Sequence, residues 1–342
     1  MRLVSTTPPA NKRFNRPANK SVIVDFIAKW GVLLTIIALI VVFSASMSSF
    51  RTISNMTTIL RAVCIVTIIA TGMTFSLAVN GIDLSVGSAA TLANTVNMTF
   101  LVWFSFGSTA GGTLQAIFIT IIISLAIAAV NSFLIVKLKI FDMLATLATM
   151  FMFEGVAMTY AGGGAINERM VRPDGLSAVG KVPAFLRTIG REPWIIIIML
   201  FVVVLAFIFL TYTKHGRYMY AVGANAEAAR LSGINVQKYR ALAYVLSAVM
   251  ASIGGILIGA RVGNAQINSG SPYLIGSVAA AHIGISVAGI GRPNAFGTLA
   301  GAILIGILEN GLIMASVPYY TVNIFKGLVL AIALALNYIR KK

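Results

Sequence analysis

The chain consists largely of uninterrupted apolar runs of about twenty residues, the length that an α-helix needs to cross the hydrocarbon core of a bilayer. Hydrophobic residues make up 58% of the 342 residues, charged residues make up 10%, and the mean hydropathy is +0.92. Soluble domains do not combine so little charge with so much apolar surface. The expected fold class is therefore all-α, a polytopic helical membrane protein.

About ten transmembrane helices are predicted, with both termini in the cytoplasm. Basic residues favour the cytoplasmic side of a membrane protein. With the N-terminus inside, 17 Lys and Arg residues fall in inside segments, 8 fall in outside segments, and Lys326 falls in the last span. The net charge of +17 is thus read as a topology signal and not as nucleic-acid binding. The predicted spans are 31–50, 62–79, 84–104, 114–136, 143–161, 194–212, 242–260, 277–290, 297–315 and 323–339.

The chain divides into a short tail and one membrane domain. Residues 1–29, rich in Pro and Asn, are expected to be a disordered cytoplasmic tail, and residues 30–342 the transmembrane domain. Two connections are longer than usual, 162–193 outside and 213–241 inside. Long polar segments commonly carry partner surfaces, although 162–193 can also be read as a plain linker.

Glycines recur at four-residue spacing in two spans, at Gly255 and Gly259 and at Gly297 and Gly301. This spacing lets helices approach closely. In a bundle of many helices we expect internal packing from it rather than dimerisation.

A polar stretch interrupts the apolar pattern at residues 80–88, which read Asn-Gly-Ile-Asp-Leu-Ser-Val-Gly-Ser. An acidic residue, hydroxyls and glycines do not suit a lipid-facing helix, and they indicate a break whose polar groups face protein or water. Two interpretations stay open. Asp83 and Ser85 cap the third span, or an interrupted helix turns these groups toward a pathway.

The inside connection contains a predicted short helix at residues 226–231. This stretch consists of strong helix formers. Asn225 suits the N-cap, Glu227 suits the first turn, and Gly233 suits the C-cap. A short capped helix on the cytoplasmic face, with small residues exposed, can dock into a groove on a partner.

These two motifs resemble those of the permease subunits of ribose/xylose/arabinose/galactose-type ABC sugar importers. Glu227-Ala228-Ala229-x-x-x-Gly233 is similar to the EAA-x-x-x-G coupling motif, and residues 80–88 resemble the G-G-I-D-L-S-V-G-S line of these permeases. The likeness extends over residues 30–340. It implies an inner-membrane permease that forms the pathway for a pentose or hexose. The coupling residues would be Asn225, Glu227, Ala228, Ala229 and Gly233.

The resemblance also implies partners. They are an ATP-binding-cassette ATPase, a periplasmic sugar-binding protein, a second permease copy or paralogue and membrane lipid, but no nucleic acid. The sequence contains no GxxxxGK[ST] phosphate loop, no Ser/His/Asp set and no metal-ligand cluster. The chain is therefore expected to be no enzyme and to bind no metal or cofactor itself, with ATP used by the partner.

The sequence departs from the family pattern at several positions. Asn80 replaces the first glycine of the G-G-I-D line, Glu309 stands where an amide or small residue is expected, and His282 lies in the eighth span. Before the ninth span the family has a glycine-rich stretch, and in this chain residues 292–294, Arg-Pro-Asn, interrupt it. These departures leave the identity of the sugar open.

Charged residues inside spans are expected to be functional or paired, because burial of a charge in the membrane is costly. Glu309 and Lys326 are predicted at similar depth and are expected to form a structural ion pair. Alternatively, Lys326 extends to the outer surface.

Sugars bind amides, carboxylates and aromatic faces, although each such residue can equally serve helix packing. The pathway candidates are Asn80, Asp83, Ser85, Asn131, Glu154, Asn264, Gln266, Asn268 and Asn310.

An ion-gradient-driven secondary transporter is the alternative. Protons could pass by way of Asp83, Glu154 and Glu309, and interrupted helices suit such a protein equally well. That alternative gives no reason for the short helix at 226–231.

Overall fold

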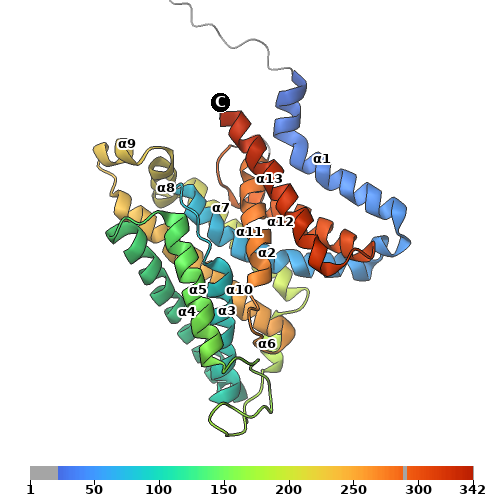
Figure 1. Ribbon diagram of the computed structural model, residues 1–342, viewed down its shortest axis with the longest axis vertical. Helices are drawn as coiled ribbons and strands as arrows, with labels where there is room; N and C mark the ends of the chain where they lie inside the picture. Colours follow the sequence, from blue (N-terminus) through green and yellow to red (C-terminus); the bar gives the residue numbers. More distant parts are fainter. Residues whose placement is uncertain (1–21, 288–290, 342) are drawn as a thin grey trace, which may run out of the picture.

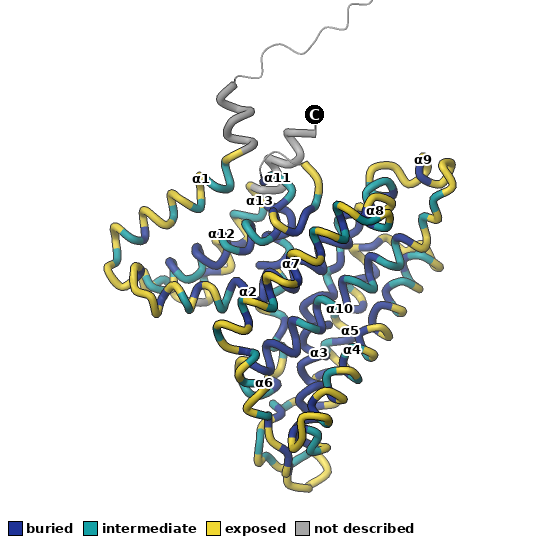
Figure 2. The backbone as a smooth tube through the Cα atoms, turned by 180° about the vertical axis from the view of Figure 1, so that it is seen from behind, coloured by how far each residue is buried: buried dark blue, intermediate teal, exposed yellow. Residues whose placement is uncertain are grey.

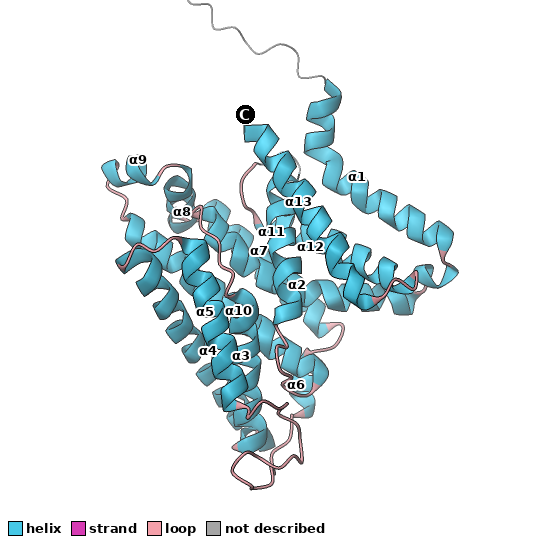
Figure 3. Ribbon diagram, viewed as in Figure 1, coloured by secondary structure: helices cyan, strands magenta, loops and turns pink. Residues whose placement is uncertain are grey.

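The computed structural model describes residues 22–287 and 291–341. The described residues are nearly all helical, and their β-structure is confined to two isolated bridges (Figure 3). Two short π-helical segments, η2 (Thr99–Trp103) and η4 (Phe133–Lys137), extend the helices before them. The helices are α1 (Val22–Ser46), α2 (Ile53–Ala78), α3 (Val86–Met98), α4 (Ala110–Ser132), α5 (Asp142–Tyr160), α6 (Ala184–Ile189), α7 (Trp194–Tyr212), α8 (Lys214–Ala224), α9 (Ala226–Leu231), α10 (Val236–Val262), α11 (Ser271–Ser286), α12 (Ala295–Met314) and α13 (Val322–Lys341).

Each of the ten predicted spans corresponds to a helix, but not all of these helices are long and apolar enough to cross a bilayer. Among the described helices six are long and apolar enough, namely α2, α4 with η4, α5, α7, α10 and α12. By contrast, α3 and α11 have only 13 and 16 residues. The multi-pass helical class is confirmed, whereas the number ten stays a prediction.

Several helix starts differ from the predicted spans. α2 begins at residue 53 instead of 62, α10 at 236 instead of 242, and the predicted span 277–290 is α11 at 271–286. These starts were wrong because the apolar run begins after the first, more polar turns. The helices α6 and α8 were not predicted at all.

Side-chain caps explain where six of the described helices begin. The Asn235 side chain accepts a hydrogen bond from the Lys238 amide at 3.0 Å, so α10 starts at the following residue, Val236. The Thr52 hydroxyl likewise accepts from the Asn55 amide at 3.3 Å and starts α2. The same type of cap starts α4, α8, α9 and α12 at Thr109, Thr213, Asn225 and Asn294.

The core lies around α2 and α10. α10 packs against α2, α3 and α4, and α2 also packs against α7, α11 and α12. Figure 2 shows α2, α3 and α10 largely buried, with exposed residues along α4 and α5. Large aromatic side chains such as Phe118, Phe151 and Phe201 are more than 60% exposed. An apolar outer surface of this kind suits lipid rather than water.

The two glycine pairs serve internal packing, as expected. A Cβ atom at Gly255 would lie 2.2 Å from the Ala90 carbonyl oxygen, so this glycine brings α10 against α3. A Cβ atom at Gly301 would lie 2.3 Å from the Ala280 carbonyl oxygen, so α12 meets α11 in the same way. Close helix contact therefore depends on the absence of side chains here.

Several connecting segments lie at two opposite ends of the molecule (Figure 1). At one end lie α8 and α9, and the Tyr220 hydroxyl there donates to the Pro293 carbonyl oxygen at 2.6 Å (Figure 1). At the other end lies α6, and the Ile166 amide donates to the Ala265 carbonyl oxygen at 2.8 Å. Arg61 and Glu192 form an ion pair at that second end. The segments around α8 and α9 and the 162–193 segment therefore lie at opposite ends of the molecule.

The predicted disordered tail, residues 1–29, falls mainly on residues 1–21, which lie outside the described residues. α1 begins at Val22.

We predict that Gly255→Ala lowers the free energy of unfolding by about 1–3 kcal/mol, because the added methyl group overpacks the α3–α10 contact. Thermal unfolding of the detergent-solubilised protein measures this. Gly155→Ala is the matched control, since a Cβ atom at Gly155 in α5 meets nothing within 4 Å. The control should be unchanged or slightly more stable. Equal melting temperatures for the two variants would contradict the packing role of Gly255.

Candidate functional site

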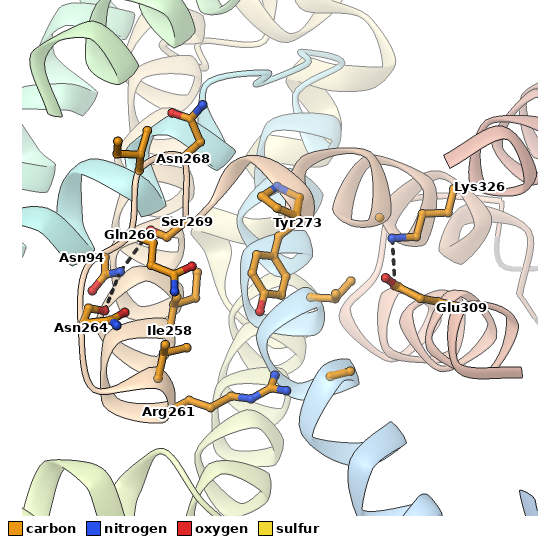
Figure 4. Close-up of a pocket in the computed structure, with 16 residues that line it drawn as sticks. Asn94, Ile258, Arg261, Asn264, Gln266, Asn268, Ser269, Tyr273, Glu309 and Lys326 are labelled. Carbon is orange, nitrogen blue, oxygen red and sulfur yellow. Dashed lines mark hydrogen bonds and ion pairs between the residues drawn. The ribbon is translucent and has the colours of Figure 1, made fainter. Parts of the chain in front are cut away.

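A cavity of about 390 Å³, lined by both polar and apolar side chains, lies between α2, α3, α10, α11, α12, α13 and residues 262–269. Its lining includes a cluster of amide side chains, an ion pair and, between them, the ring of Tyr273 (Figure 4). The amide cluster comprises Asn94, Asn264 and Gln266, and Asn268 lines the cavity apart from these three. The cavity lies toward the end that carries α6, because residues 262–269 contact the 162–193 segment there.

Asn94 of α3 organises the amide cluster. Its side chain is fully buried, and its Nδ2 donates to the Ser269 hydroxyl at 3.1 Å and to the Asn264 carbonyl oxygen at 3.4 Å. Gly259 leaves room for this side chain, because a Cβ atom there would lie 2.3 Å from Asn94 Oδ1. Sequence reasoning missed Asn94, since it is one of several small polar residues within a span.

The other part of the cavity wall is the ion pair between α12 and α13. Lys326 Nζ lies 2.8 Å from Glu309 Oε2, and Lys326 is only 5% exposed. Lys326 therefore faces the carboxylate instead of extending to the surface. Both side chains line the cavity, a feature that the sequence did not indicate.

The other pathway candidates occupy different places. Asn264 and Gln266 line the cavity. Glu154 accepts a hydrogen bond from the Ser271 hydroxyl at 2.9 Å, at the start of α11. Asn80 is exposed at the end of α2, where its φ of 59° reverses the chain. Asn310 is half-buried on α12, outside the residues that line this cavity.

Asp83, Ser85 and Asn131 come together in one buried network at the helix break. The Ser85 hydroxyl and amide donate to Asp83 Oδ1 at 2.6 and 3.0 Å, and Asn131 Nδ2 donates to the Ser85 hydroxyl at 2.8 Å. The Thr149 hydroxyl donates to Asn131 Oδ1 at 2.6 Å, and the Ser247 hydroxyl donates to Asp83 Oδ2 at 2.7 Å. The break is therefore held by α4, α5 and α10.

A second buried carboxylate, Asp142, lies beside this network and was not singled out from the sequence. It is the first residue of α5 and only 5% exposed. The Tyr244 hydroxyl donates to its Oδ2 at 2.5 Å, and Arg240 forms an ion pair with its Oδ1. The only sequence signal was an acid at the start of a span, which alone fits the helix dipole.

The short helix α9 is formed at residues 226–231 with Asn225 as its N-cap, as predicted, whereas its C-cap is Ser232 and Gly233 is the next residue. Asn225 Oδ1 accepts a hydrogen bond from the Ala228 amide at 2.9 Å, and Gly233 follows the helix with a φ of 81°. Glu227 pairs with Arg230 at 2.6 Å on the exposed surface. Ala229 is buried, whereas Leu231 is 80% exposed, so α9 presents an apolar tip at the edge of the molecule (Figure 1).

Glu168 links distant parts of the 162–193 segment through a hydrogen bond and an ion pair. Although partial burial raises the pKa of this carboxyl, the Val182 amide at 2.7 Å and the Arg187 guanidinium at 2.7 Å together hold its pKa below the ordinary value. The Arg172 guanidinium lies over the ring of Trp103, 5.7 Å from its centroid. This connection is thus an ordered cap over one end of the bundle.

Within residues 22–287 and 291–341, no three His, Cys, Asp or Glu side chains group in a way that could hold a metal ion.

Similarity to known proteins covers most of the chain. The family described as branched-chain amino acid transport system / permease component matches residues 55–334. The ribose import permease protein RbsC of Escherichia coli (strain K12) is 34% identical over 306 residues, which cover 89% of this chain and 92% of that protein. No solved structure matches the chain significantly.

Two further relatives match the chain over a similar length. RbsC of Bacillus subtilis (strain 168) is 32% identical over 319 residues, covering 92% of this chain and 93% of that protein. The xylose transport system permease protein XylH of Escherichia coli (strain K12) is 27% identical over 362 aligned positions, covering 90% and 91%. Permeases of this kind are transporter components and not enzymes, and they give no support to the secondary-transporter alternative.

We predict that Lys326→Met lowers the free energy of unfolding by about 2 kcal/mol, between the values for exposed and buried pairs. The change leaves the Glu309 carboxylate without its cation. Thermal unfolding measures the loss, and Arg230→Met, which breaks an exposed pair, should cost far less. Exchanging the charges, Lys326→Glu with Glu309→Lys, should recover stability. An exchange no more stable than either single variant would show that the pair contributes nothing.

Proposed function

The chain belongs to the family of branched-chain amino acid transport system permease components, and we propose that it carries a monosaccharide, a pentose or hexose, through the cytoplasmic membrane of a bacterium. In this proposal it is the permease subunit of an ATP-binding-cassette importer and forms the translocation pathway. The observation that carries the proposal is the likeness to ribose and xylose permeases over about nine-tenths of both chains.

A sugar is the favoured substrate class although the family description names branched-chain amino acids. The named relatives cited above transport ribose or xylose by their own names. The amide-rich part of the cavity wall supports the same class, since amides can both donate to and accept from hydroxyl groups. Within this proposal Asn264 and Gln266 face the passing solute.

The proposed complex contains other protein subunits besides this chain. The permease family implies an ATP-binding-cassette ATPase and a periplasmic binding protein as partners. We add a second permease copy or paralogue, so that two chains enclose the pathway within the lipid. ATP is bound and hydrolysed by the partner ATPase, and this chain binds no cofactor.

The proposed topology has ten spans with both termini in the cytoplasm. The excess of basic residues in the inside segments supports it, as does the gathering of these segments at the end that carries α8 and α9. The cavity then belongs to the outer half of the protein, where a periplasmic binding protein would release its ligand.

The helix α9 is the proposed contact with the ATPase. Its N-cap at Asn225 and the turn at Gly233 make it a stiff unit, and its exposed small residues, including Ala228, allow a groove to close around it. Glu227 lies on its exposed surface. In this proposal, closure of the ATPase pair moves α9 and thereby switches the pathway.

We predict that Glu227→Lys abolishes ATP-driven sugar uptake and weakens co-purification of the ATPase, while membrane insertion stays normal. The reversal breaks the pair with Arg230 and places a cation in the first turn, where the helix dipole disfavours it. Gly233→Asp should have the same effect, because a φ of 81° is unfavourable for any residue that carries a side chain. Uptake of ribose and of xylose in reconstituted vesicles measures transport.

Asp174→Lys provides the matched control, because it makes the same type of charge reversal at the opposite end of the molecule. ATPase co-purification should be normal in this control. The proposal fails if the Glu227 and Gly233 variants retain uptake. It also fails if the chain alone accumulates solute in liposomes under an ion gradient.

A further inference from the structure

α10 follows α9 after only four residues, 232–235, and this connection is a closed hydrogen-bonded turn. The Ile234 amide donates to the Ala229 carbonyl oxygen at 3.0 Å, and the Gly233 amide donates to the Arg230 carbonyl oxygen at 3.0 Å. This pair of bonds is the Schellman arrangement that ends helices rigidly. Asn235 then caps α10 directly. A displacement of α9 is therefore passed to the start of α10 and not absorbed in a loose linker.

The first turns of α10 carry three polar side chains on one face. Arg240, Tyr244 and Ser247 are spaced by four and three residues, which places them in line along a helix. Arg240 and Tyr244 both bind the carboxylate of Asp142, and Ser247 binds the carboxylate of Asp83. One helix face thus holds both buried acids.

These two acids enclose the helix break between α2 and α3. A Cβ atom at Gly81 would lie 2.5 Å from Asp142 Oδ2 and 2.6 Å from the Tyr244 hydroxyl oxygen, so the backbone of the break rests on this pair. The Thr146 hydroxyl, one turn along α5, accepts from the Leu84 amide at 3.1 Å. The break has little freedom to move independently of α5 and α10.

We propose that Arg240 and Asp142 are positioning residues that transmit movement of α9 to the helix break at residues 79–85. This inference rests on the proposed function, because it presumes that a partner displaces α9. Separating the two charges would leave an unpaired carboxylate in a buried site, which is strongly unfavourable. The start of α10, the start of α5 and the break therefore move together when α9 is pushed.

The test uses the permease assembled with its ATPase in nanodiscs, with hydrogen–deuterium exchange measured before and after trapping with ATP and vanadate. In the wild type, exchange should change in residues 226–235 and, by about tenfold, in residues 79–85, a usual size for allosteric coupling. In Arg240→Gln and Asp142→Asn, the change at 226–235 should remain, and the change at 79–85 should be lost. A purely structural role would not separate the two segments.

Three further variants sharpen the result. Arg240→Lys keeps the charge and should retain most of the response at 79–85. Tyr244→Phe removes one hydrogen bond to Asp142 without changing shape, should reduce the response, and decides the question if Arg240→Gln does not fold. Arg172→Gln breaks an ion pair at the opposite end and should respond as the wild type does.

The inference is overturned if residues 79–85 respond in Arg240→Gln or Tyr244→Phe as they do in the wild type. It is also overturned if trapping alters 226–235 in the wild type without altering 79–85. A failure of the proposed function looks different, because the ATPase would then leave exchange at 226–235 unchanged in the wild type.

Discussion

The buried carboxylate of Asp83 imposes the condition that the surrounding helices have to meet. A helix break within a membrane protein frees backbone groups that lipid cannot satisfy, and a charge at the break adds a larger desolvation cost. Asp83 is 1% exposed and receives hydrogen bonds from the Ser85 amide and hydroxyl and from the Ser247 hydroxyl. The break itself supplies Ser85 and α10 supplies Ser247, while α4 and α5 supply the partners of the neighbouring groups.

The same requirement explains why the two ends of α10 carry different types of residue. Near its start it carries hydrogen-bonding side chains, because it satisfies the break. Toward its end it carries Gly255 and Gly259, because α3 has to approach closely enough for Asn94 to reach residues 264–269. A single helix therefore organises both the break and the amide part of the cavity wall.

Local features could be predicted from the sequence, whereas contacts between distant segments could not. The predicted span 194–212 has the observed bounds of α7, because its apolar run is uninterrupted and coincides with the helix. The N-cap of α9 was predicted because capping depends on residues at most a few positions apart. By contrast, Ser247 lies 164 residues from Asp83 in the chain, so periodicity carried no information about their contact.

The site features that could not be predicted from the sequence share this physical reason. Asp142 resembles an ordinary first-turn acid, and its partner Arg240 falls in the predicted connection 213–241, although the structure places it on α10. Asn94 looked like one small polar residue among several. Glu309 and Lys326 were paired correctly by depth along their helices, but their position at a cavity depends on how α11 lies between them and the amide cluster.

The attachment of α9 differs from that of the long helices of the bundle, and the difference bears on its role. Six residues are too few for a helix that is stable by itself, and of these six only Ala229 is buried. The stability of α9 comes from its two caps, which keep it internally stiff but leave it weakly held by the bundle. A stiff helix with little packing against its own protein can move as a unit once a partner encloses it. The rigid turn at 232–235 then gives that movement one direct route, along α10 and toward the break that Asp83 occupies.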